Sequence, residues 1–110
     1  MSDLARFAAD LRGSADTLTR RASQVVRKAA LDTMADAKTL APVDTGNLRN
    51  SITTDARQGD LRAVVEATAD YSAYIEWGTS KMQPQPFMQP AQDRNIEPFM
   101  DAIAQLAEGV

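Results

Sequence analysis

The amino-acid sequence predicts an α+β fold, in which a long N-terminal helix packs on a small antiparallel sheet built from a hairpin and a C-terminal helix follows. Apolar residues recur every three or four positions over 1–41, alternate over 48–69, and return to the helical period over 92–108. Helices at both ends with strands between them are typical of the α+β class. At 110 residues the chain has the size of a single domain.

Residues 1–41 are expected to form one long helix with two apolar stripes. The first stripe consists of Leu4, Phe7, Leu11, Ala15, Leu18, Ala22, Val25 and Ala29, and the second of Val26, Ala30, Met34, Ala37 and Ala41. The second stripe is rotated by roughly 100° from the first, which indicates two different neighbours. We expect one to be the domain's own sheet and the other an adjacent subunit. Gly13 either bends the helix or divides it, and we favour a bend.

A turn and a hairpin are expected after the helix. Pro42 should end the helix, because the residue before a proline is pushed out of helical geometry. Asp44 and Gly46 are turn formers, and the alternating pattern begins at Leu48. A second turn at 58–60 separates this first strand from a second one, which predicts an antiparallel hairpin over 48–69.

Residues 71–91 combine aromatic residues with prolines. We expect one helical turn, capped by Asp70 and ended by Gly78, and then an extended stretch at a sheet edge. Pro90 is suited to the first turn of the last helix. Pro98 falls within that helix, which is therefore either kinked there or begins there.

Four of the six aromatic residues lie in this segment, in a chain whose apolar share is rich in alanine. A small domain needs every large side chain for its core, so we favour a core role. Rings beside proline-rich chain are also typical of interfaces, and the same cluster could serve both uses. The interface candidates are Tyr71, Tyr74, Trp77, Phe87, Met88 and Met34.

The residues that usually carry catalysis are scarce. The chain has no histidine and no cysteine, so it lacks the commonest general base, the commonest metal ligand and the strongest nucleophile. Carboxylate pairs such as Asp44 with Asp55 or Asp70 with Glu76 arise by chance among fifteen acidic residues. We expect no enzymatic activity, and the absence of cysteine excludes zinc sites of the usual kind. No apolar run approaches the roughly 18 residues of a membrane span, so we expect no membrane association.

One group of basic residues stands out against a net charge of −3. Arg20 and Arg27 project the same way from a helix, with Lys28 beside Arg27. A solvated face is the usual interpretation. Alternatively, these residues could line a channel in a ring of subunits and contact passing DNA through its phosphates, independently of sequence.

Two stretches carry a family resemblance: APVDTGNLRNSI at 41–52 and YSAYIEWGTSKMQPQPFMQPA at 71–91. They resemble the signature of the tail-completion proteins of long-tailed bacteriophages. The matching positions are Ala41-Pro42, Asp44-Thr45-Gly46, Leu48, Ser51-Ile52, Tyr71, Tyr74-Ile75-Glu76, Gly78-Thr79, Pro84, Pro86-Phe87-Met88 and Pro90-Ala91. The resemblance covers essentially the whole chain, with departures at Gln83 and Pro98.

The resemblance implies a virion structural protein that completes the tail and joins it to the head connector. It implies a ring of about six copies in the neck, assembled in the bacterial host cytoplasm, with tail terminator, tail tube and head connector proteins as partners. It implies no catalysis, cofactor or metal. Another neck component, such as a tail terminator or head-closure protein, is the main alternative, and a small host-binding regulatory module is a further one.

Overall fold

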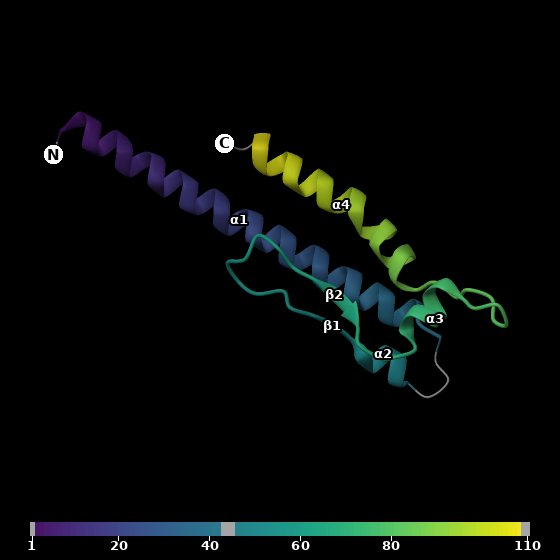
Figure 1. Ribbon diagram of the computed structural model, residues 1–110. Coiled ribbons are helices and arrows are strands. Elements are labelled where there is room, and N and C mark those ends of the chain that lie inside the picture. Colours follow the sequence, from purple (N-terminus) through teal and green to yellow (C-terminus); the bar gives the residue numbers. More distant parts are fainter. Residues whose placement is uncertain (1, 43–45, 109–110) are drawn as a thin grey trace.

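The computed structural model describes residues 2–42 and 46–108. Two long helices, α1 (Asp3–Leu40) and α4 (Met88–Glu108), lie side by side, and a small hairpin packs on another side of α1 (Figure 1). The hairpin consists of β1 (Ile52–Thr54) and β2 (Val65–Ala67), and two short helices, α2 (Asn47–Ser51) and α3 (Ser72–Trp77), flank it. The expected α+β class and order of elements are confirmed.

α1 is a single helix of 38 residues that continues through Gly13. The Oγ atom of Ser2 accepts a hydrogen bond from the backbone N–H of Ala5 at 3.2 Å and caps its first turn. The helix ends at Leu40, with Ala41 in an extended conformation before Pro42, as the sequence predicts. At 1.5 Å per residue its length is about 57 Å.

The predicted starting residue of the first strand is wrong. Residues from Leu48 were expected to be extended, but α2 occupies this position and the strand begins only at Ile52. Leu48 and Ile52 are four residues apart, a spacing that places two side chains on one face of either a helix or a strand. Both are buried, so the pattern of burial is correct although the conformation is not.

The hairpin is short and its connection is long. Ile52 pairs with Ala67, and Thr54 pairs with Val65, in antiparallel register. The expected turn is present, with Gly59 at a φ of 96°, and the backbone N–H of Gly59 donates to the Oγ of Ser23 on α1 at 2.8 Å. The connection is therefore fastened to the long helix.

Two expectations for residues 70–91 are wrong. Asp70 does not cap α3, because the N-cap is Tyr71 and no side chain caps it. The stretch after Gly78 does not extend the sheet: it forms a bridge between Thr79 and Met82, and the N–H of Gln85 donates to the carbonyl of Ile75 at 2.8 Å. This stretch therefore packs on α3 instead of on a strand.

α4 begins at Met88, four residues earlier than the predicted boundary. Pro90 lies in its first turn, as expected, because the first N–H groups of a helix have no partner within it. Pro98 lies inside the helix, which runs from Met88 to Glu108, so the alternative in which the helix begins at Pro98 is wrong.

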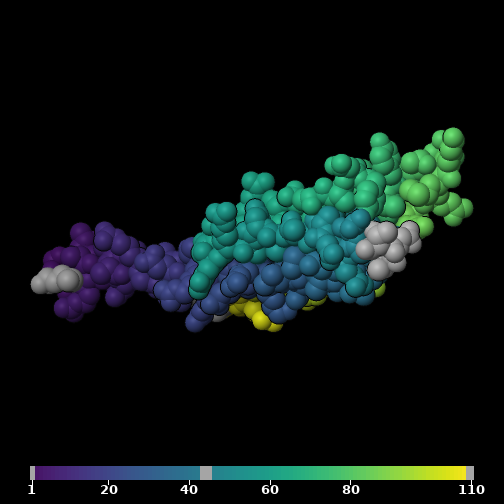
Figure 2. All heavy atoms as spheres, turned by 90° about the horizontal axis from the view of Figure 1, so that it is seen from below, coloured from purple at the N-terminus to yellow at the C-terminus, as the bar shows by residue number. Residues whose placement is uncertain are grey.

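The core lies at the end of the molecule where α1, α2, β1 and α4 meet. Its buried apolar residues are Ala37, Ala41, Leu48, Ile52, Phe87 and Ala91. Half of them are alanines, and the N-terminal part of α1 projects beyond this body (Figure 2). The molecule measures 71 × 21 × 20 Å, with a radius of gyration of 19.2 Å, whereas a compact chain of this length has about 13 Å.

Candidate interaction surfaces

The projecting part of α1, residues 3–18, carries an uncovered apolar stripe; we call this segment the arm. The exposed fractions are 78% for Leu4, 59% for Phe7, 56% for Leu11 and 37% for Leu18. Their spacing places these four side chains on one face of the helix. A contiguous row of large exposed apolar groups, unlike isolated ones, indicates an interaction site.

The arm stripe continues the face of α1 on which α4 lies. Further along this stripe, Val25 and Ala29 share the lining of a small cavity with Phe99 of α4, and Leu18 lies near Leu106. The second stripe of α1 meets the core through Ala30 and other buried alanines. The expectation of two neighbours therefore needs a correction, because the first stripe is covered by α4 along its C-terminal half.

Three aromatic rings are exposed on and beside α3. Tyr71 is 39% exposed, Tyr74 is 59% exposed and Trp77 is 72% exposed. Tyr74 and Trp77 are three residues apart, so they share a face of α3. The core role that we favoured for these three rings is wrong, and their exposure suits the interface role. That role stays a prediction.

The other three interface candidates differ from these rings. Phe87 is only 1% exposed and is one of the two largest fully buried side chains, so it belongs to the core. Met34 and Met88 are half-buried and pack against that core. The core role that we favoured is therefore confirmed for Phe87. The side chains of Met34 and Met88 support the body of the subunit, so the interface role expected for these three residues is corrected.

Glu76 has a structural role that was not predicted from the sequence. This buried carboxylate accepts hydrogen bonds from the backbone N–H groups of Phe87 at 3.2 Å, Met88 at 2.9 Å and Gln89 at 3.2 Å. These amides belong to the start of α4, where a negative charge is favourable. Glu76 is thus the cap of α4, supplied by α3, and the glutamate before Gly78-Thr79 in the sequence motif was the available signal. Nothing in the structure supports a carboxylate pair between Glu76 and Asp70.

Gly78 is the second structural residue of this motif. Its φ of 76° and ψ of 178° belong to a region that is essentially restricted to glycine. A Cβ atom there would lie 2.8 Å from the carbonyl oxygen of Met82 and 2.8 Å from Pro84. Gly78 therefore turns the chain from α3 back toward the start of α4.

The basic residues lie on the surface of α1, as predicted. Arg20 and Arg27, seven residues apart, share a face that is roughly 180° from the arm stripe, since Arg20 follows Leu18 by two residues. Lys28 forms an ion pair of 2.6 Å with Asp32, and the two side chains are 79% and 47% exposed. Such surface pairs contribute little to stability.

The predicted turn residues lie between α1 and α2. Pro42 is half-buried directly after the end of α1, and Gly46 has a φ of 80° and precedes α2. Asp44 lies outside the described residues. In α2 the Nε of Arg49 donates to the carbonyl of Lys38 at 3.2 Å, which satisfies a free carbonyl in the last turn of α1.

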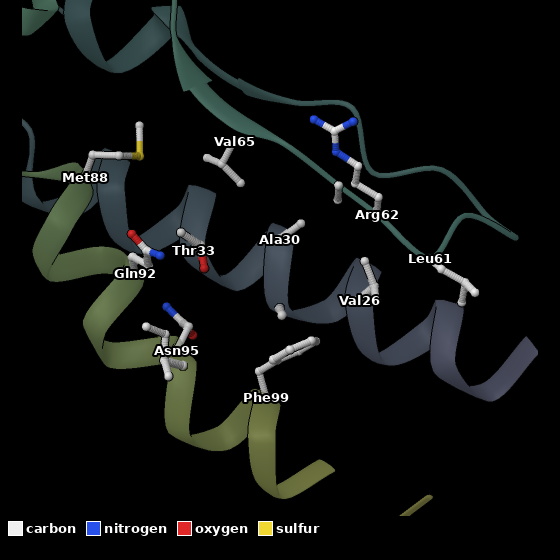
Figure 3. Close-up of a pocket in the computed structure, with 13 residues that line it drawn as sticks. Val26, Ala30, Thr33, Leu61, Arg62, Val65, Met88, Gln92, Asn95 and Phe99 are labelled. Carbon is white, nitrogen blue, oxygen red and sulfur yellow. The ribbon is translucent and has the colours of Figure 1, made fainter. Parts of the chain in front are cut away.

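An apolar groove lies between α1, the hairpin and α4 (Figure 3). Its volume is about 470 Å³, and its lining includes Val26, Leu61, Val65, Ile96 and Phe99. Leu61 and Ile96 are 59% and 46% exposed, so the groove is open to the surface. The groove was not predictable from the sequence, because its three walls come from distant segments.

Within residues 2–42 and 46–108, no group of three or more histidine, cysteine or acidic side chains is placed to hold a metal ion. None of the helices in this part of the chain combines the length and the apolar character that crossing a membrane requires.

These surfaces and this fold define a small α+β subunit with more apolar surface than its own chain covers. Such surface is typical of proteins that complete their burial in an assembly. A family model described as "Bacteriophage HK97-gp10, putative tail-component" matches residues 5–78. The match covers well over half of the chain, which therefore belongs to this family of phage tail components. This confirms the resemblance to tail proteins.

The family match includes the arm, the hairpin and α3, and it ends at Gly78. A search of curated proteins found no significant match. A search of solved structures found none either. As a phage tail component the protein belongs to the virion and interacts with other virion proteins.

Proposed function

We propose that the protein is a tail-completion subunit, which forms a ring of about six copies at the head-tail joint and connects the tail to the head connector. It assembles in the host cytoplasm and contacts tail terminator, tail tube and connector proteins. The role requires no catalysis, cofactor or metal. The motifs at 41–52 and 71–91 support the specific place in the tail.

One observation carries the proposal: apolar side chains are uncovered at opposite ends of an elongated subunit. The arm stripe lies at one end of the molecule, and α3 with Tyr74 and Trp77 lies near the other (Figure 1). A ring subunit needs two different lateral surfaces, one for each neighbour. A subunit at a joint also needs surfaces for the proteins above and below it.

The experiment replaces an exposed ring without disturbing the fold. Trp77→Ala in phage-producing cells should leave filled heads and finished tails unjoined, as counted by electron microscopy of lysates. Gln83→Ala, an exposed change in the neighbouring loop, is the matched control and should give joined particles. Joined particles at the normal frequency with Trp77→Ala would contradict the role of α3.

The axial position separates this proposal from its nearest alternative. Cryo-electron microscopy of the isolated neck should place the subunit between the tail end and the connector. A position inside the tail terminator ring or the head-closure ring would instead favour one of those components. Recovery of a soluble host protein with the chain, and absence of the chain from particles, would favour a regulatory module.

The proposal includes a contact between DNA and the basic face of α1. Arg20 and Arg27 are exposed and point away from the arm stripe, so they are free when the stripe is covered. In a ring, this face would contact DNA phosphates in the channel. Assembled rings carrying Arg20→Gln and Arg27→Gln should bind duplex DNA more weakly and with a smaller salt dependence, whereas Arg94→Gln on α4 should not change binding.

A further inference from the structure

We propose that the arm stripe of one copy docks in the apolar groove of the next copy. This inference rests on the proposed function, because it names the lateral contact of the ring. The two surfaces match in kind: the stripe is a row of protruding Leu and Phe side chains, and the groove is an apolar depression of about 470 Å³. One contact would therefore cover both.

The contact has to be intermolecular. Val26 and Ala30 of α1 form one wall of the groove (Figure 3), and the arm belongs to the same continuous helix. Phe7 is 23 residues from Ala30, a separation of about 34 Å along the helix. A straight helix cannot bring its own N-terminal stripe onto its own middle, so the arm reaches a groove only on another molecule.

Charges favour the same pairing. Asp3 and Asp10 lie seven residues apart along one edge of the arm stripe. Arg62 lies at the hairpin side of the groove (Figure 3). Across residues 2–42 and 46–108 the single ion pair joins Lys28 and Asp32, so none of these three charges has an ionic partner among the described residues. Docking would bring acidic side chains of the arm toward Arg62.

The polar lining of the groove does not suit a small ligand. Asn95 already donates from its Nδ2 atom to the Oδ2 of Asp36 at 2.8 Å and to the carbonyl of Ala91 at 2.7 Å. Arg62 is the single charged side chain of the lining, and Thr33, Gln92 and Asn95 are its other polar residues. A ligand pocket usually has several polar groups that converge on one point.

The pairing also fits the symmetry of a ring. Two different surfaces that meet head to tail form a heterologous contact, which closes into a ring when the rotation between copies is right. Two arms packed on each other would form an isologous dimer and would leave both grooves open. Docking of the arm stripe in the groove would therefore cover more of the exposed apolar surface than arm-to-arm pairing would.

Cysteine cross-linking tests this contact directly, because the chain contains no cysteine. We would introduce Phe7→Cys in the stripe and Ile96→Cys at the groove, both at exposed positions. A short thiol-specific bifunctional reagent should join a mixture of the two single variants into dimers, and the double variant into a ladder of higher oligomers. Ala9→Cys is the control, since residue 9 lies about 200° around the helix from residue 7. Combined with Ile96→Cys it should give at least tenfold less product.

Two results would overturn the inference. One is efficient cross-linking of Phe7→Cys with itself and not with Ile96→Cys, which would show arm-to-arm pairing. The other is no 7–96 product at any protein concentration, including conditions in which rings are visible. The proposed function is tested separately, by the presence of the protein at the head-tail joint of particles. Presence there without 7–96 cross-links would reject the contact alone, and absence from the joint would reject the function.

Discussion

The carboxylate of Glu76 accepts a hydrogen bond from the backbone N–H of Met88 at 2.9 Å, so a side chain of α3 caps the first turn of α4. The same carboxylate also accepts from the amides of Phe87 and Gln89. This arrangement joins the two ends of the loop that carries the proline-rich part of the motif. It explains structurally why a glutamate precedes Gly78 by two residues.

Replacing this carboxylate should destabilise the subunit. Glu76→Ala leaves three amides without their acceptor, and we expect a loss of about 2–4 kcal/mol in the free energy of unfolding. Glu76→Gln keeps one acceptor oxygen but places an NH₂ group among N–H donors, so its loss should be smaller, about 1–2 kcal/mol. Urea denaturation followed by circular dichroism measures both. Glu97→Ala, an exposed change on α4, should stay within about 0.5 kcal/mol, and an equal loss there would contradict the cap.

Ser23→Ala should loosen the hairpin connection. Ser23 is 3% exposed, and its Oγ is the acceptor for the N–H of Gly59, 36 residues away. Its removal leaves that N–H unpaired, at a cost of about 1 kcal/mol. Amide hydrogen exchange should accelerate at Gly59 and its neighbours, while exchange in α4 changes little. Ser14→Ala, exposed on the same helix, is the control, and unchanged exchange at Gly59 in Ser23→Ala would reject the fastening role.

The periodicity of the sequence was sufficient to predict the two long helices, because their apolar spacing has only one structural interpretation. It failed at the first strand because the spacing of four between Leu48 and Ile52 fits both a helical turn and a strand. The φ of 80° at Gly46, at the start of α2, depends on the surrounding chain and was not readable from residue type alone.

The burial of the aromatic residues does not follow from their residue types. Phe87 and Trp77 have the same apolar character in the sequence, yet one is 1% and the other 72% exposed. The difference depends on tertiary placement: Phe87 lies where α4 meets the core, whereas Trp77 ends a short helix at the surface. The groove is likewise a product of three distant segments, so no local pattern could predict it.

Two glycine substitutions should have opposite effects on stability. Gly78→Ala places a Cβ within 2.8 Å of backbone atoms at a φ of 76°, so we expect a loss of more than about 2 kcal/mol. Gly13→Ala meets no atom within 4 Å and lies inside α1, so we expect a gain of about 0.5–1 kcal/mol. Thermal unfolding of both variants measures the contrast. A neutral Gly78→Ala would show that the turn can adopt another conformation.

Phe87→Ala and Trp77→Ala should separate folding from assembly. Phe87 fills the core, so its truncation should cost about 3–5 kcal/mol and unfold much of the protein, given the thin core around it. Trp77 is exposed, so its truncation should change the free energy of unfolding by less than about 0.5 kcal/mol while particle joining is lost. Chemical denaturation gives the first quantity, and particle counts give the second. If Trp77→Ala instead unfolds the subunit as strongly as Phe87→Ala does, the indole side chain contributes to the fold. The absence of the variant protein from particles would then no longer report on an interface.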